Sequence, residues 1–349
     1  MINNPFFLFP GQGAQYQGMA LDLLEPSFKC GGGEKLKHLF SMASDIFGKD
    51  MIALLRDSSP EVLKRTDLSQ PAITLANLAA AACLTENGLE PAGCAGFSLG
   101  EYAALVVTGV ISEEDCFSLV TARGKAMQAA IDKIAGGKES AGANIGAAAG
   151  ASGAGMAAVI GLAPEKVEAL VAEWKAGKDS ALAELYAANI NSPRQTVVSG
   201  SAAALAEAEK LFAAAGARRF MRLEVAGPFH SPFMARAAEE FGPFLDKITF
   251  NDPRIPFYSN VTGKRVFSGG EAKKLALLQI TSAVRWVDEE EAINAEKDAP
   301  VGGIGACFEA GPGNVLERLW RDSGSEIPCH AAGTAADISA IFADGNKTC

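Results

Sequence analysis

The sequence predicts an α/β protein with a larger domain built on a central, mostly parallel sheet and a smaller domain inserted into it. The chain has 349 residues, more than one compact core usually accommodates. In the first 134 residues, short apolar runs that end in glycine-rich turns alternate with helical patterns. Between residues 155 and 226 the order changes to strand, helix, strand, strand, helix, strand.

The elements expected in the first part of the chain follow from its apolar runs and the turns that end them. A buried strand over residues 6–9 stops at the sequence PGQG. Helical patterning covers residues 17–57, with an interruption at CGGGEK, and resumes at 70–87. A second short strand, AGCAGF, ends at Ser98, and helices follow over SLGEYAALVVTG and EEDCFSLVTARGKAMQAAI.

The middle of the chain predicts a separate unit. Residues 135–154 are rich in glycine, alanine and serine, so we expect a linker or insertion there. The strand and helix patterns of residues 155–226 have the order of a ferredoxin-like domain. Residues 1–134 and 227–349 are therefore expected to form one discontinuous α/β domain.

The composition argues against several functional classes. Asp and Glu number 41 against 31 Lys and Arg, and no basic run occurs, so we expect no nucleic-acid partner. The seven cysteines are scattered without a C-x-x-C pair, which indicates reduced thiols in the cytoplasm and no metal site. The longest apolar stretch, residues 72–84, is shorter than a membrane span and predicts a buried helix, so no membrane partner is expected.

Ser98 lies in the sequence GFSLGEY, between an expected strand and an expected helix. A G-x-S-x-G sequence in this context places a serine hydroxyl on a sharp turn. The helix N-terminus behind it directs free N–H groups, including that of Leu99, to where an oxyanion would form. The alternative is that Ser98 only caps the helix, since serine is a favoured N-cap residue. The strand–turn–helix context favours the nucleophile.

A nucleophilic serine needs a base, and the chain contains three histidines. His38 lies beside lysines in a helical pattern, which is typical of an exposed face. His230 lies in the Gly- and Pro-containing sequence VAGPFHSPFM at the expected domain junction, where clefts tend to form. His330 lies near the C-terminus, where an α/β-hydrolase has its histidine. His230 and His330 both remain candidates, with a preference for His230.

Arg123 shares one face of an expected helix with apolar side chains. A guanidinium on such a face is costly unless it meets an anion. That anion is either an internal carboxylate or the carboxylate of a substrate bound near Ser98. The sequence spacing does not decide between the two.

A set of short sequences, ordered from residue 6 to about residue 340, resembles malonyl-CoA:acyl carrier protein transacylases: FPGQG, GFSLGEY, RGKAM, NSPRQTVVSG, GPFHSPFM, QITSAVRW and GPGNVL. The resemblance implies a hydrolase-like α/β domain with a ferredoxin-like insert. It also implies an acyltransferase that moves malonyl from malonyl-CoA to the phosphopantetheine thiol of acyl carrier protein through a malonyl-serine ester. Such an enzyme supplies fatty acid biosynthesis and needs no metal or other cofactor.

The resemblance assigns the reacting groups. It implies that Ser98 is the nucleophile and His230 its general base. The backbone N–H of Gln12 would complete the oxyanion hole with that of Leu99. A main-chain carbonyl in the segment of Gln279 would orient the histidine in place of a triad carboxylate.

The resemblance also assigns the groups that bind substrate. Arg123 corresponds to the arginine that holds the free malonyl carboxylate, while Gln279 and Phe229 line the site. The family usually has histidine before the nucleophile, where this chain has Phe97, and we expect that change to affect packing rather than chemistry. The carrier proteins of the family are acidic, so a basic docking surface is expected from Arg194, Arg218, Arg219, Lys264, Arg265 and Arg285.

Two alternatives from other functional classes stay open at the level of sequence. One is a serine hydrolase or thioesterase that uses Ser98 and His330, with Asp288 or Asp298 as the carboxylate. The other is a non-catalytic module that binds carrier protein, which only Phe97 favours.

Overall fold

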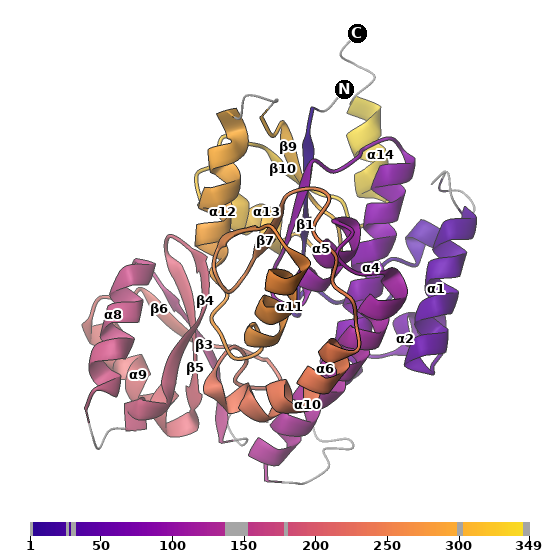
Figure 1. Cartoon of the computed structure of the whole chain (residues 1–349). Coiled ribbons are helices and arrows are strands. Elements are labelled where there is room, and N and C mark those ends of the chain that lie inside the picture. Colours follow the sequence, from indigo (N-terminus) through magenta and orange to yellow (C-terminus); the bar gives the residue numbers. More distant parts are fainter. Residues whose placement is uncertain are drawn as a thin grey trace.

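Two β-sheets organise the chain, for which the computed structural model describes residues 3–25, 28, 33–136, 153–177, 181–298 and 303–344 (Figure 1). Among these residues the larger sheet has the strand order β10-β9-β1-β2-β7-β8, and the smaller has the order β4-β5-β3-β6. The strands are β1 (Pro5–Phe9), β2 (Gly93–Gly96), β3 (Ala154–Ile160), β4 (Leu185–Ser192), β5 (Gln195–Ser201), β6 (Arg219–Arg222), β7 (Phe257–Ser259), β8 (Lys264–Val266), β9 (Ala306–Glu309) and β10 (Cys329–Ala331). The helices are α1 (Gly33–Phe47), α2 (Met51–Asp57), α3 (Pro60–Leu63), α4 (Thr66–Glu86), α5 (Gly100–Val107), α6 (Glu113–Ile134), α8 (Pro164–Lys175), α9 (Ala202–Ala214), α10 (Ala235–Asp246), α11 (Gly269–Leu278), α12 (Trp286–Asn294), α13 (Val315–Asp322) and α14 (Ala335–Asp344).

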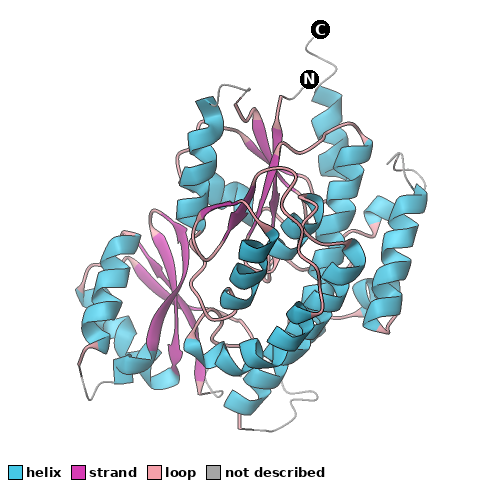
Figure 2. Ribbon diagram, in the orientation of Figure 1, coloured by secondary structure: helices cyan, strands magenta, loops and turns pink. Residues whose placement is uncertain are grey.

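The larger sheet is mostly parallel, as expected. Its neighbouring strands run parallel except β7 and β8, which are antiparallel. Along β1, Phe7 and Phe9 share an apolar cluster with residues of α1, α4, α5 and α6, whereas Phe6 and Leu8 share another with residues of α12 and α13. Figure 2 shows helices on both sides of this sheet. A strand buried on both faces is apolar throughout, which explains the sequence PFFLF.

The smaller sheet forms the expected ferredoxin-like unit, in the chain order β3, α8, β4, β5, α9, β6. Its pairings are antiparallel. On one face it packs against α8 and α9 through a cluster that includes Val159, Val171 and Phe212. Met156 and Val197, on the other face, belong to the core cluster of the larger sheet. One face of this sheet is therefore turned toward the rest of the molecule.

Strand β4 of the smaller sheet is hydrogen-bonded to Val284, in the segment just before α12. The N–H of Ile190 in β4 donates to the carbonyl oxygen of Val284 at 2.8 Å, and the N–H of Val284 donates to that of Ala188 at 2.9 Å. The domain boundaries expected from the sequence, 155–226 for the insert and 1–134 with 227–349 for the larger domain, stay a prediction. Most of the expected linker, residues 137–152, lies outside the described residues.

Helix α4 is long and apolar enough to cross a membrane by length and composition alone. However, 94% of its apolar window is buried inside the molecule, and it belongs to the core cluster that packs on β1. The prediction of a buried helix over residues 72–84 is therefore confirmed.

The expectation that helical structure begins at residue 17 is wrong. Residues 10–21 form turns, followed by a short 3-10 helix over Asp22–Leu24. The backbone φ angles of Gly13, Gly18 and Ala20 are 105°, 84° and 62°, and a right-handed helix cannot contain such values. The apolar spacing in this segment reflects burial of a loop against the core.

Candidate active site

The candidate reacting groups lie at the carboxyl edge of the larger sheet. β1 leads into the loop that carries Gln12, β2 leads into Ser98, and β7 leads into Asn260. Because β1, β2 and β7 are neighbouring parallel strands, their carboxyl ends meet. This edge is where open α/β sheets bind ligands.

Ser98 occupies a left-handed backbone conformation with a φ of 51° between β2 and α5. Such a φ is unfavourable for a residue with a Cβ and must be held by its surroundings. The flanking glycines permit the sharp turn, because a Cβ at Gly100 would overlap the carbonyl oxygen of Phe9 and one at Gly96 would overlap the backbone of Gly100. The turn thus has the geometry expected of the G-x-S-x-G sequence.

Two side-chain amides hold this turn by hydrogen bonds. Oδ1 of Asn260 accepts the N–H of Ser98 at 2.6 Å, and Nδ2 of Asn260 donates to the carbonyl oxygen of Gly96 at 2.7 Å. Nε2 of Gln279 donates to the carbonyl oxygen of Ser98 at 3.0 Å. Asn260 was not singled out from the sequence, where its only signal is its place directly after the strand in IPFYSN. It positions Ser98 rather than reacting.

His230 lies beside Ser98, with Nε2 2.7 Å from the serine Oγ. Its Nδ1 faces the backbone carbonyl oxygens of Gln279 at 2.9 Å and Ser282 at 3.2 Å. Because both of these groups are acceptors, the ring proton belongs on Nδ1, which leaves the Nε2 lone pair for the serine hydroxyl. Burial, and after it the charge of Arg123, lower the pKa of His230 to about 4, so the imidazole is neutral at pH 7.

The other two histidines lie elsewhere. His330 is exposed on β10, at the edge of the larger sheet, where its ring lies 5.7 Å from that of Phe308. His38 is exposed on α1, as expected. The structure pairs Ser98 with His230, so the pairing of Ser98 with His330 that a hydrolase of this chain would use is not formed.

The loop that carries Gln12 contacts the turn that carries Leu99. A Cβ atom added at Gly11, the neighbour of Gln12, would lie only 3.5 Å from the backbone nitrogen of Leu99. The side chain of Gln12 is held by α4, because Nε2 donates to Ser69 Oγ at 3.0 Å and Oε1 accepts from Gln70 Nε2 at 3.1 Å. Leu99 is the N-cap of α5, at the positive end of that helix. Within the described ranges, neither backbone N–H has an acceptor, so both are free for an oxyanion.

Arg123, on α6, is fully buried, and its guanidinium lies 5.4 Å from the ring centroid of Tyr102. Nη2 donates to Oε1 of Gln279 at 3.1 Å. Nε and Nη1 have no hydrogen-bond partner in the described part of the chain. A buried guanidinium with two unused donors is an unfavourable arrangement, which a bound carboxylate would correct.

The internal ion pair considered for Arg123 is not formed among the residues that the structure describes. The buried carboxylate of Glu101 instead accepts the N–H of Asn260 at 2.8 Å, and Glu289 accepts from Nδ2 of Asn260 at 2.6 Å. Burial raises the pKa of Glu101 to about 7 and raises that of Glu289 well above its usual value. These carboxyl groups therefore hold Asn260 by hydrogen bonds and form no salt bridge with Arg123.

Ser98 and His230 line a cavity of about 370 Å³. Phe229 lines it too, as do Met127 of α6 and Met156 of β3 in the smaller sheet. The remaining predicted site residues, Leu99, Arg123 and Gln279, are fully buried and do not line the cavity. No group of three or more His, Cys, Asp or Glu within the described ranges is arranged to hold a metal ion.

Phe97 packs its ring edge-to-face on Trp286, with the centroids 5.5 Å apart, and lines the cavity. We expect Phe97→His to lower the Tm by about 1–4 °C, because such aromatic contacts contribute about 0.5–1.5 kcal/mol. The rate of Ser98 acylation should stay within about threefold, because Phe97 takes no part in the hydrogen bonds of His230. Calorimetry and single-turnover mass spectrometry measure the two effects, and a rate change above tenfold would contradict a packing role.

Taken together, the fold and the site define a serine–histidine acyl-transfer enzyme with a buried arginine beside the reacting pair. Residues 6–147 and 148–303 match the family of the acyl transferase domain. The chain is 33% identical over 96% of its length to the malonyl CoA-acyl carrier protein transacylase of Haemophilus influenzae, of which it covers 96%. It is 35% identical over 90% of its length to that of Escherichia coli strain K12, of which it covers 90%. The chain therefore belongs to the malonyl-CoA:acyl carrier protein transacylase family.

Solved structures and one longer relative agree with this assignment. The acyl carrier protein S-malonyltransferase of Vibrio cholerae has a TM-score of 0.82 at 33% identity, over 97% of this chain and 100% of that one. A malonyl-transacylase in complex with a type II polyketide acyl carrier protein also has a TM-score of 0.82, at 31% identity, over 98% of this chain and 100% of that one. The polyketide biosynthesis protein ThaF of Burkholderia thailandensis is 35% identical over 90% of this chain, which spans 24% of ThaF.

Proposed function

We propose that this protein transfers the malonyl group of malonyl-CoA to the phosphopantetheine thiol of an acyl carrier protein, through a malonyl ester of Ser98, and thereby supplies fatty acid biosynthesis. The observation that carries the proposal is the contact of 2.7 Å between Ser98 Oγ and His230 Nε2 in the cavity. The relatives named for this reaction support it over nearly the whole chain.

In the first half-reaction, Nε2 of His230 takes the proton of the Ser98 hydroxyl as Oγ attacks the thioester carbonyl carbon. The N–H groups of Gln12 and Leu99 stabilise the tetrahedral oxyanion. When the carbon–sulfur bond breaks, CoA leaves as a thiol that carries the proton from His230. The backbone carbonyl oxygen of Gln279 holds the ring throughout, because Nδ1 keeps its proton.

In the second half-reaction, the carrier-protein thiol gives its proton to His230 and its sulfur attacks the malonyl ester. The ester bond breaks, and the proton returns to Ser98. Arg123 holds the malonyl carboxylate in both halves, and its two free donors suit a carboxylate. It selects a dicarboxylic acyl group against an uncharged one of similar size.

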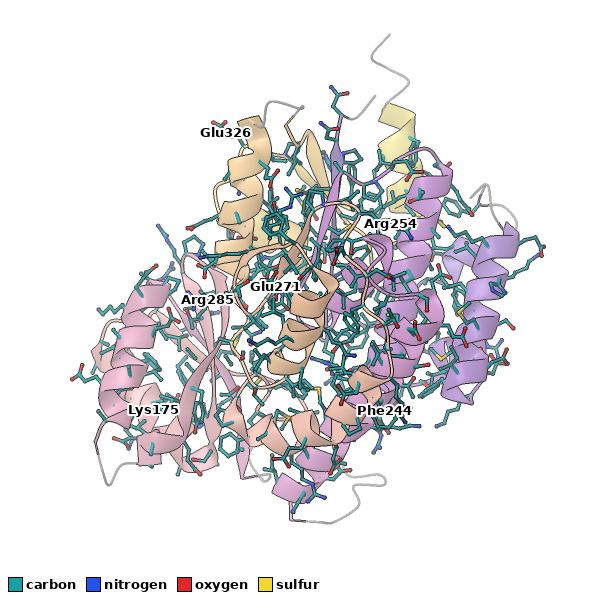
Figure 3. The ribbon with its side chains drawn as sticks, in the orientation of Figure 1. Lys175, Phe244, Arg254, Glu271, Arg285 and Glu326 are labelled. Carbon is teal, nitrogen blue, oxygen red and sulfur yellow. The ribbon has the colours of Figure 1, made fainter. Side chains whose placement is uncertain are left out.

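The proposal includes a cytoplasmic location and a basic surface that docks the carrier protein. No cysteine within the described ranges forms a disulfide bond, which fits the expected cytoplasmic location. Of the basic residues expected to dock the carrier protein, Arg285 (labelled in Figure 3) forms ion pairs with Asp288 and with Glu168 of α8. Arg265 pairs with Glu296 at 3.5 Å. The docking surface therefore depends more on the exposed remainder: Arg194, Arg218, Arg219 and Lys264.

Intact-protein mass spectrometry after brief incubation with malonyl-CoA tests the function. We expect a malonyl adduct on the wild type and on His330→Ala, none on Ser98→Ala, and slow formation on His230→Ala. Steady release of CoA without an adduct and without a thiol acceptor would indicate a hydrolase. A folded wild-type protein that forms no adduct and releases no CoA would contradict the proposal and favour a binding module.

A further inference from the structure

The charged groups that line the active-site cavity form a single pair. Lys64 is the only lysine or arginine in the lining given by the described residues, and Glu224 is the only carboxylate. Nζ of Lys64 and Oε2 of Glu224 are 3.0 Å apart. The Glu224 side chain is 69% exposed and that of Lys64 is 30% exposed, so the pair marks the open end of the cavity.

The pair joins segments that are far apart in the sequence. Lys64 lies between α3 and α4, and Glu224 lies just after β6 of the smaller sheet. An exposed ion pair of this kind contributes about 0–1 kcal/mol. A phosphate oxygen binds lysine at least as well as a carboxylate does, so an incoming phosphate exchanges with Glu224 at little cost.

The chemistry of the reaction directs a phosphate toward the opening of the cavity. The thioester end of either substrate must reach Ser98 in the cavity, so the rest of the pantetheine arm extends toward the opening. Malonyl-CoA and the carrier protein differ in almost everything except this arm. Both carry a phosphate at its far end, as a diphosphate in CoA and as a phosphodiester in the carrier protein.

We propose that Lys64 binds the phosphate of the pantetheine arm in both half-reactions, and that Glu224 stays paired with Lys64 until the arm enters. This inference rests on the proposed function and adds a binding residue to it. Glu224 acts as an intramolecular competitor that each arm displaces. A single contact then serves donor and acceptor alike.

Steady-state kinetics of Lys64→Ala and Glu224→Gln test the inference with three substrates: malonyl-CoA, carrier protein, and malonyl-pantetheine, which lacks the phosphate. We expect Lys64→Ala to raise the KM for malonyl-CoA and for carrier protein by about tenfold at unchanged kcat, as for the loss of one charge-assisted contact. Glu224→Gln should lower both KM values by about twofold to fivefold. Neither substitution should change the kinetics of malonyl-pantetheine.

The controls separate this contact from a structural role. Lys210→Ala removes a similar exposed pair, with Glu207 at 3.0 Å on α9, and should leave every KM unchanged. An equal loss with malonyl-pantetheine, an effect on only one of the two phosphate-bearing substrates, or a rise in KM with Glu224→Gln would each overturn the inference. A malonyl adduct on wild-type protein from malonyl-pantetheine supports the acylation step of the proposed function, even if Lys64→Ala leaves every KM unchanged.

Discussion

His230→Ala is expected to slow the acylation of Ser98 by about a thousandfold, because a positioned general base contributes roughly 10²–10⁴ to such a step. The ring is the only side chain within the described ranges that forms a hydrogen bond with Ser98 Oγ. Rapid-quench mass spectrometry of the malonyl adduct measures the rate under single-turnover conditions. His330→Ala is the matched control and should react at the wild-type rate.

The wild-type rate should also depend on pH in a particular way. The base works only when neutral, and its pKa is lowered to about 4 by burial and by the charge of Arg123. The acylation rate should therefore be flat from about pH 8 to pH 5 and should fall about tenfold per unit below pH 4. A fall centred near pH 6.5, the ordinary value for histidine, would contradict a buried, neutral base.

Arg123→Met is expected to lower malonyl transfer by about a hundredfold to a thousandfold while acetyl transfer from acetyl-CoA is kept or increased. The reason is that a bidentate, charge-assisted contact to the malonyl carboxylate contributes a few kcal/mol. Methionine fills much of the volume of the arginine without its charge, so packing against Tyr102 is largely retained. Competition between malonyl-CoA and acetyl-CoA for the adduct on Ser98 measures the change in selectivity directly.

This variant should also fold at least as stably as the wild type. Two guanidinium nitrogens of Arg123 are buried without partners among the described residues, and such groups lower the stability of the free enzyme. Thermal unfolding of Arg123→Met should give an equal or higher Tm. Equal losses of malonyl and acetyl transfer, in a variant that is folded, would remove the assignment of Arg123 to substrate.

Local sequence predicts those parts of the site that depend on local geometry. The turn at Ser98 follows from its glycines, and the burial of Arg123 follows from the helical spacing around it. The choice between His230 and His330 did not follow, because it depends on which loops the sheet brings to one edge. For the same reason, local sequence does not predict that Asn260 meets Ser98 across 162 positions.

The same limit applies to charges. The spacing around Arg123 predicted that its guanidinium needs an anion, but not whether the protein or a substrate supplies that anion. Only the structure shows that the nearby carboxylate of Glu101 is hydrogen-bonded to Asn260 instead. The pairing of Lys64 with Glu224 likewise depends on the placement of the smaller sheet. The incorrect helix near residue 17 has a local cause, since the left-handed angle at Ala20 is one that alanine rarely adopts.

The face of the smaller sheet that carries Met156 and Val197 lines the cavity together with α6 and with loops at the carboxyl edge of the larger sheet. Recognition of the two substrates is thereby divided between the smaller sheet and the elements around the larger sheet. Under the proposed function, the choice of the acyl group depends on Arg123 of α6, whereas Arg194, Arg218 and Arg219, which are expected to dock the carrier protein, belong to the smaller sheet and its loops. We therefore expect substitutions in and around the smaller sheet to change the preference for a carrier protein without changing the preference for the acyl group.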